Sequence, residues 1–223
     1  MSNRNVLSTL TLISLAIGLA LAAFFIERIN DYYHAETVRH SAQDHLAVLE
    51  GRLESNLIGD IQLVKGLVAV IAADPKIDQT RFARAMKTLF EGHTRLKNIS
   101  AAPDLIIQMM YPLEGNELAI GLDFRTRPDQ FPAVELARST RQIVLNGPIQ
   151  LVQGGCGFIA QIPIYFDTAT AKDVFWGLSS IVIRCEQLYE DSGLLNNDLE
   201  LEIAIRARNG DGTLGAVFFG NAE

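Results

Sequence analysis

The chain has 223 residues, a formal net charge of −7 at pH 7 and 48% hydrophobic residues. This apolar content is normal for a globular protein and argues against intrinsic disorder. The acidic balance argues against nucleic acids and anionic lipid surfaces as partners, because both are bound through basic surfaces.

The first predicted element is an uncharged, mostly apolar run over residues 6–26. It is long enough to cross the ~30 Å hydrocarbon core of a bilayer as a helix. Arg4 precedes the run, and the first acidic residue, Glu27, follows it. Because positive charge stays in the cytoplasm, we expect a cytoplasmic tail, an anchor in a bacterial inner membrane and a periplasmic domain.

A cleaved signal peptide is the alternative interpretation of this run, since Ala20-Leu21-Ala22 resembles a cleavage site. A retained anchor is favoured because the run continues into a helical pattern without a proline or glycine break. Over residues 30–73 no proline occurs and apolar residues recur every three or four positions, which predicts one long amphipathic helix. Its apolar stripe can face its own domain, a second copy of the chain, or both at different heights. Asp74-Pro75 ends the helix, because the residue before a proline avoids helical geometry.

The elements after this helix alternate between short helices and strands. Asp78 can cap a helix that runs through about Glu91. Strands are predicted at 106–111, 118–124, 148–152, 158–166, 175–183, 199–208 and 214–219, with helices at 130–142 and 187–191. This order predicts an antiparallel α+β sheet rather than a doubly wound one. The last strand has no partner strand after it, so we interpret the chain as a piece of a longer protein.

The two cysteines, Cys156 and Cys185, flank the hairpin formed by the strands at 158–166 and 175–183. If this hairpin is symmetric about its loop, the two residues lie directly opposite each other, which satisfies disulfide distances. Two buried free thiols are the open alternative. The sequence has no CxxC or HExxH motif and no His/Cys cluster with ligand spacing, so we expect neither a metal site nor a cofactor.

Three stretches, taken together, resemble the CHASE domain. This domain is the extracellular sensory module of bacterial receptor kinases and cyclases and of plant cytokinin receptors. The matching stretches are Tyr111-Pro112-Leu113-Glu114-Gly115-Asn116-Glu117 leading to Gly121-Leu122-Asp123, Asn146 to Gly155 leading to Gly157-Phe158 and Ile162-Pro163-Ile164-Tyr165, and Trp176-Gly177. The resemblance extends to the last residues of the chain.

The resemblance implies a division of the chain into four parts. These are a tail and transmembrane helix (1–26), a stalk helix (27–74), a membrane-distal PAS-like ligand-binding subdomain (75–196) and the start of a membrane-proximal PAS-like subdomain (197–223). The family continues with further strands, a second membrane helix and a cytoplasmic kinase or cyclase. A homodimer through the stalk helix is expected from the family.

Positions that hold the ligand in plant members correspond to Asp123, Leu151 and Gln161, and the resemblance adds Phe158 as a further ligand contact. Asp123 matches in kind, whereas Gln161 replaces a threonine, which argues against adenine-type cytokinin binding. Some other small polar or charged ligand is an equal alternative. The alternative for Asp123 is that it caps or braces the segment of Arg125 and Arg127.

The leading functional hypothesis is a sensor that binds a small molecule outside the cytoplasm and passes the signal to a cytoplasmic effector. An exported hydrolase is less favoured, because His93 is the only histidine outside the stalk and no GxSxG motif occurs. The third hypothesis is an architectural anchor that recruits a partner through the stalk. We therefore expect a non-enzymatic, membrane-anchored chain.

Overall fold

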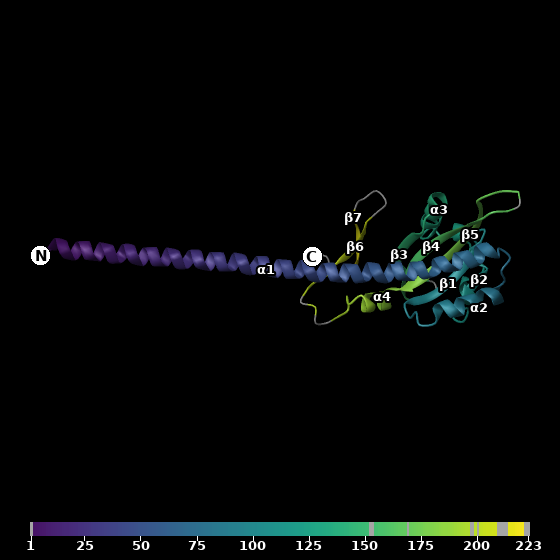
Figure 1. Ribbon diagram of the computed structural model, residues 1–223, viewed down its shortest axis with the longest axis horizontal. Coiled ribbons are helices and arrows are strands. Elements are labelled where there is room, and N and C mark those ends of the chain that lie inside the picture. Colours follow the sequence, from purple (N-terminus) through teal and green to yellow (C-terminus); the bar gives the residue numbers. More distant parts are fainter. Residues whose placement is uncertain are drawn as a thin grey trace. The chain divides into compact units, whose positions relative to one another are not determined.

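The computed structural model describes the backbone of residues 2–151, 154–168, 170–196, 199, 201–208 and 214–220. Within these ranges it describes the side chains of all residues except 2–17, 20, 22, 23 and 67. The chain divides into two compact units, Met1–Val48 and Leu49–Glu223. Figure 1 labels the helices and strands in chain order.

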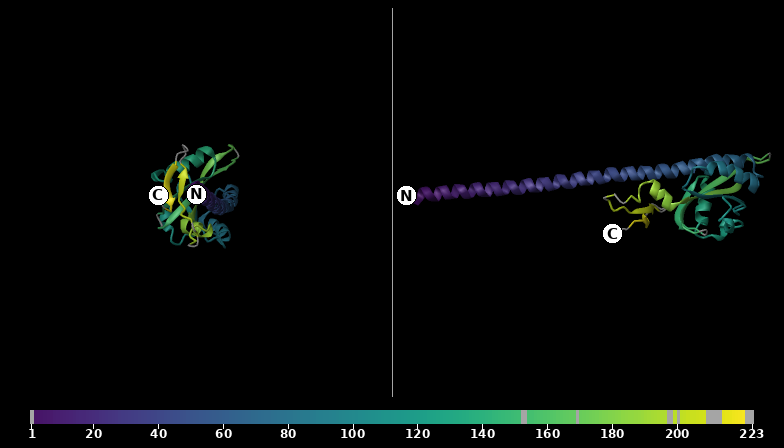
Figure 2. Two further views of the ribbon diagram at one scale, coloured as in Figure 1. Left: turned by 90° about the vertical axis from the view of Figure 1, so that its left-hand side faces the viewer. Right: turned by 90° about the horizontal axis from the view of Figure 1, so that it is seen from below.

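The long helix α1 spans Ser2–Ala73 without a break, as the right view of Figure 2 shows. It ends one residue before Asp74-Pro75, where the sequence predicted its end. By length and composition, α1 contains the one helical segment among the described residues that is apolar enough to cross a membrane. The predicted span at 6–26 lies in α1, and most of its side chains are outside the described set.

The apolar stripe of α1 is used differently along its length. In the unit Leu49–Glu223, Leu49, Val64 and Ile71 are buried in the domain core. In the unit Met1–Val48, Val38 and Leu46 of the same stripe remain exposed. The C-terminal part of the stripe therefore faces its own domain, which is one of the arrangements that the sequence allowed.

Helix α2 spans Gln79–Phe90 and begins where the sequence predicted. The carboxylate of Asp78 accepts a hydrogen bond from the backbone N–H of Arg81 at 2.8 Å, which satisfies a donor that the first helical turn leaves unpaired. Phe82 and Met86 point into the core. The second predicted helix is thus confirmed.

A five-stranded antiparallel sheet forms the centre of the domain. Its order is β2-β1-β5-β4-β3, with β1 Leu96–Pro103, β2 Met109–Tyr111, β3 Val144–Gln150, β4 Cys156–Phe166 and β5 Val174–Arg184. Two short helices pack against the sheet: α3 (Phe131–Thr140) and α4 (Cys185–Asp191). The predicted α+β class is confirmed.

The two faces of the sheet have different cores. One face carries Ile99, Ile162 and Ile181, which pack with α1 and α2. The other face carries Ala102 and Leu178, which pack under residues 105–124 and α3. Because side chains alternate along a strand, each strand supplies both cores, which explains why β4 and β5 are mostly apolar.

The β4–β5 hairpin has the register that the sequence predicted. Phe158 pairs with Ile183 and Ile164 pairs with Gly177, with a bulge only beyond Ile164. The structure joins Cys156, the first residue of β4, to Cys185, directly after β5, with their Cα atoms 5.6 Å apart. The bond closes the open end of the hairpin.

One predicted strand is wrong, another is shortened, and one observed strand was not predicted. Residues 118–124 form no strand: they begin in the 3-10 helix η1 (Glu117–Ala119) and end in the 3-10 helix η2 (Phe124–Thr126), with one isolated bridge between Asp123 and Ile106. Strand β1 was missed because its sequence, LKNISAAP, holds few β-branched or aromatic residues. The strand predicted at 199–208 is shortened to β6, Ile205–Arg208, which pairs with β7, Leu214–Phe219. The predicted turn at 209–212 lies outside the described residues.

Candidate ligand-binding site

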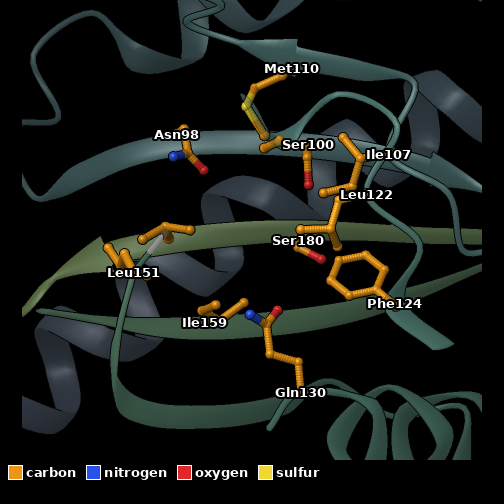
Figure 3. Close-up of a pocket in the computed structure, with 12 residues that line it drawn as sticks. Asn98, Ser100, Ile107, Met110, Leu122, Phe124, Gln130, Leu151, Ile159 and Ser180 are labelled. Carbon is orange, nitrogen blue, oxygen red and sulfur yellow. The ribbon is translucent and has the colours of Figure 1, made fainter. Parts of the chain in front are cut away.

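A cavity of about 40 Å³ lies between the sheet face that carries Ser100 and Ser180 and the segment that covers it. This is room for a few water molecules. Its lining side chains come from six stretches of the chain: Asn98, Ser100, Ile107, Met110, Ala119, Leu122, Phe124, Gln130, Leu151, Ile159, Ser180 and Val182. Figure 3 shows these residues converging from the sheet and from the covering loops.

The floor of the cavity is built by the register of three strands. Ser100 of β1 lies opposite Ser180 of β5, and Ser180 lies opposite Gln161 of β4. We call these three residues the polar row. They are nearly or fully buried. The hydroxyl of Ser180 donates a hydrogen bond to Oε1 of Gln161.

The cover of the cavity is held by amide side chains. Nδ2 of Asn98 donates to Oδ1 of Asn116 at 2.8 Å, and Nδ2 of Asn116 donates to the carbonyl of Pro112 at 3.0 Å. The first bond ties the turn at Glu114-Gly115-Asn116 to β1, and the second holds the Asn116 side chain within its own turn. The turn predicted from the sequence is therefore the anchor of the cover.

Leu151 reaches the cavity because a glycine makes room for it. A Cβ at position 157 would lie 2.9 Å from Cδ1 of Leu151 and 2.9 Å from Cγ1 of Val182. Gly157 therefore permits both side chains to pack against the strand at a place where alanine would collide with them. The prediction that Leu151 faces the site agrees with this position.

The other predicted ligand contacts occupy different places. Gln161 is fully buried beside the cavity floor, bonded to Ser180, and does not itself line the cavity. Phe158 points to the opposite face of the sheet and packs edge-on against Tyr189 and Phe218. Phe158 directly precedes Ile159, which lines the cavity. Adjacent residues of a strand face opposite sides of the sheet, so Phe158 must face away from the cavity.

Asp123 is engaged by its own segment. Its carboxylate accepts hydrogen bonds from the backbone N–H and from Nε of Arg125, at 2.9 and 2.8 Å. Hydrogen bonding from the Arg125 side chain is the main cause that holds the pKa of Asp123 below its ordinary value. Its neighbours Leu122 and Phe124 line the cavity, so Asp123 caps the loop that carries them. This matches the bracing role that the sequence left open.

A cluster of charges links the sheet to the helices beside it. Arg95, just before β1, donates from Nε and Nη2 to both oxygens of Asp60 on α1, at 2.8 and 2.9 Å. Its Nη1 donates to Asp191 at the end of α4, at 2.7 Å. These bonds, led by the one to Asp60, raise the pKa of Arg95. We call these three residues the Arg95 cluster.

A second, larger cavity of about 700 Å³ lies beside the disulfide. Its lining includes Lys97, Arg184, Glu186 and Phe218. It is more open than the first cavity and lies on charged surface rather than between the sheet and its cover. We therefore take the first, partly enclosed cavity as the candidate site.

Comparison with known proteins gives a family model and similar structures. The model of the CHASE domain matches residues 71–218, which includes the whole cavity. No curated protein is similar enough to count as a match.

Among solved structures, the chain is similar to an extracellular ligand binding receptor from Desulfohalobium retbaense, with 17% identity and a TM-score of 0.52 over 66% of this chain and 26% of that chain. It is also similar to the ligand-binding domain of the Pseudomonas aeruginosa amino acid chemoreceptor PctC in complex with GABA, with 20% identity and a TM-score of 0.45 over 65% of each chain. The chain thus spans about a quarter and about two thirds of these proteins. The first likeness supports the fold.

Proposed function

The chain belongs to the CHASE domain family, and from this membership we propose that it senses a small molecule outside the cytoplasm and signals to a cytoplasmic effector. In this family the domain is the extracellular sensory module of receptors. The effector proposed here is a histidine kinase or a nucleotide cyclase. The chain itself is proposed to be non-catalytic.

The observation that carries this proposal is the partly enclosed cavity between the polar row and its cover. Ligand sites of this kind are concave, mostly apolar and fitted with a few polar groups. The cavity has eight apolar and four uncharged polar lining residues. Two of the predicted ligand contacts, Leu151 and Gln161, lie at this cavity or directly behind its floor. We propose the cavity as the ligand site, with Asp123 acting through the loop that it caps.

Transmission is proposed to run from β1 to α1. Asn98 and Ser100 at the cavity follow Arg95 along β1, and Arg95 is bonded to the buried carboxylate of Asp60 on α1. Asn56 of α1 also donates to Oγ of Ser192 at 3.1 Å. We propose that β1 can adopt two positions. A ligand that binds one of these conformations more tightly than the other would shift α1 through these bonds, because only differential binding moves an equilibrium.

The membrane and dimer assignments are part of this proposal. We propose that residues 1–26 hold a cytoplasmic tail and an inner-membrane anchor, 27–74 the stalk, 75–196 the distal ligand-binding subdomain and 197–223 the start of the proximal one. We propose a homodimer through the exposed N-terminal part of the stripe, at Val38 and Leu46.

Light scattering of the chain in nanodiscs tests the homodimer. A dimer that Val38→Glu with Leu46→Glu dissociates supports it, and a monomeric parent chain contradicts it.

The ligand-binding proposal is tested by a thermal-shift screen of small metabolites on the full chain in detergent. A specific ligand raises the melting temperature, since at one hundred times its Kd it adds about 2.7 kcal/mol of stability. Ala119→Leu, which fills the cavity, should abolish the shift. Ala133→Leu on α3, outside the cavity lining, should retain it.

The baseline melting temperature of each variant, measured without ligand, shows whether the variant folds. Shifts that survive Ala119→Leu in a folded protein would move the ligand site elsewhere. The absence of any shift from a broad library would contradict the sensory proposal.

A further inference from the structure

The polar row contains a hydrogen-bond donor that the described part of the chain leaves unused. Nε2 of Gln161 is buried and has no acceptor among the described residues. Its Oε1 is already taken by the hydroxyl of Ser180. A buried N–H without an acceptor costs free energy that a bound acceptor would recover. Gln161 lies directly behind the cavity floor, so a ligand that brings an acceptor past Ser180 would satisfy this donor.

The neighbouring amide offers the complementary group. Nδ2 of Asn98 is committed to Asn116, so the amide is oriented with its oxygen toward the cavity (Figure 3). Ser100 also directs its hydroxyl oxygen into the same space, and the Gln130 amide approaches from the opposite wall (Figure 3). This edge of the cavity offers both acceptors and donors, and it lies against Met110, Phe124 and Ile159.

No charged side chain lines the cavity among the residues that the structure describes. The carboxylate of Asp123, predicted to meet the ligand, is paired with Arg125 instead. A charged ligand would lose its hydration without gaining a counter-charge, and this penalty is large in a buried site. A neutral ligand avoids the penalty and still satisfies the polar edge.

From these observations we propose that the cavity selects an uncharged, compact molecule with a carboxamide-like donor and acceptor on one edge and apolar carbon on the other. This inference rests on the proposed function, and it replaces the sequence expectation of a polar or charged ligand by a neutral one. The cavity volume of about 40 Å³ limits the ligand to a small one or requires the cover to move outward.

Isosteric pairs that differ in charge test the inference. Isobutyramide is neutral at pH 7, whereas isobutyrate has the same shape and is an anion. Both are titrated by thermal shift into the full chain in detergent. We expect isobutyramide to bind at least about tenfold more tightly, a ratio equivalent to about 1.4 kcal/mol.

Two serines provide matched variants for the same titration. Ser100→Ala removes a hydroxyl from the cavity and should weaken isobutyramide several-fold. Ser179→Ala removes a hydroxyl from the adjacent position, on the opposite face of β5, and should leave the affinity unchanged. Equal effects of the two variants would contradict the role of the polar row.

The outcomes separate this inference from the proposed function. If isobutyrate or other charged compounds bind as tightly as isobutyramide, and Ala119→Leu abolishes their binding, the cavity is a ligand site that does not select neutral molecules. If no compound of either kind gives a shift that depends on Ala119, the proposed function fails, and the inference fails with it. Neutral compounds that bind selectively and depend on both Ala119 and Ser100 support both.

Discussion

At the scale of single residues, the Arg95 cluster buries a carboxylate whose desolvation is offset by charged hydrogen bonds. Asp60 is 1% exposed and depends on the two hydrogen bonds from Arg95, while Arg95 is about one fifth exposed. A buried carboxylate without its partner carries a desolvation penalty that nothing offsets. The cluster thus holds α1 against β1 through hydrogen bonds whose loss would leave a buried charge unpaired.

Arg95→Met should lower the free energy of unfolding by about 3–5 kcal/mol, because it leaves the Asp60 carboxylate buried and unpaired. The double variant Arg95→Met with Asp60→Leu should recover most of this loss, since it removes both charges together. Urea unfolding of the parent chain, the single variant and the double variant measures these free energies of unfolding. A double variant that is as unstable as the single one would show that packing, rather than charge, is what Arg95 supplies.

The exposed aspartates predict how stability changes in acid. Hydrogen bonds from Arg125 lower the pKa of Asp123, and Arg127 does the same for Asp129. Stability from these pairs is present above the ordinary aspartate pKa of 3.8 and is lost as pH falls through the lower folded-state values. Arg125→Gln should make the loss below pH 3.8 shallower, whereas Arg84→Gln should not. Chemical unfolding at a series of acidic pH values would contradict this if the two variants had equal slopes.

The sequence located part of the candidate site through the family resemblance. Leu151 lies at the cavity and Gln161 lies behind its floor. Asp123 was assigned to the ligand because a carboxylate was expected at the pocket floor, but Arg125, two residues away, offers a closer partner. Ser100 and Ser180 were missed. Each is a polar residue in an otherwise mostly apolar strand. That the two lie opposite each other can be seen only when β1 is known to pair with β5.

At the scale of elements, close contact between β1 and β5 decides where the cavity floor lies. Gly177 has a φ of +148°, and a Cβ there would lie 2.1 Å from the carbonyl oxygen of Ala102. Trp176, beside it, donates from Nε1 to the carbonyl of Pro75 at 3.0 Å, which ties β5 to the segment after α1. Trp176 is therefore a structural residue.

Gly177→Ala should destabilise the domain by about 1–3 kcal/mol, because the added methyl must push β1 away from β5. Gly154→Ala is the matched control, since Gly154 also has a positive φ of +82° but no atom within 4 Å of the added methyl. It should cost only the strain of a left-handed alanine, about 1 kcal/mol. Thermal unfolding compares the two, and equal losses would contradict the account of the close contact.

Elements with strong periodicity were predicted well, and those decided by tertiary contacts were not. The ends of α1 and α2 follow from Asp74-Pro75 and Asp78, which act locally. The apolar hairpin β4–β5 follows from its own pattern. By contrast, residues 118–124 have the composition of a strand, yet there they wrap over the cavity as a loop. Nothing in their local sequence distinguishes these two outcomes.

At the scale of the whole molecule, one continuous path of contacts joins the cavity to α1. The polar row lies on β1, β5 and β4, and the Arg95 cluster joins β1 to α1 and α4. The stripe of α1 is buried in the domain at Leu49, Val64 and Ile71. A ligand that changes the packing of the cavity cover is therefore expected to change the contacts of the helix as well.

The most direct test of this account is hydrogen–deuterium exchange on the full chain, with and without the compound that gives the largest thermal shift. We predict that bound ligand slows exchange in residues 104–130, which cover the cavity, and in β1 and β5 beneath it. Slowed exchange confined to residues 154–156 and 184–190, around the second cavity, would contradict the claim that the cavity under residues 104–130 is the ligand site.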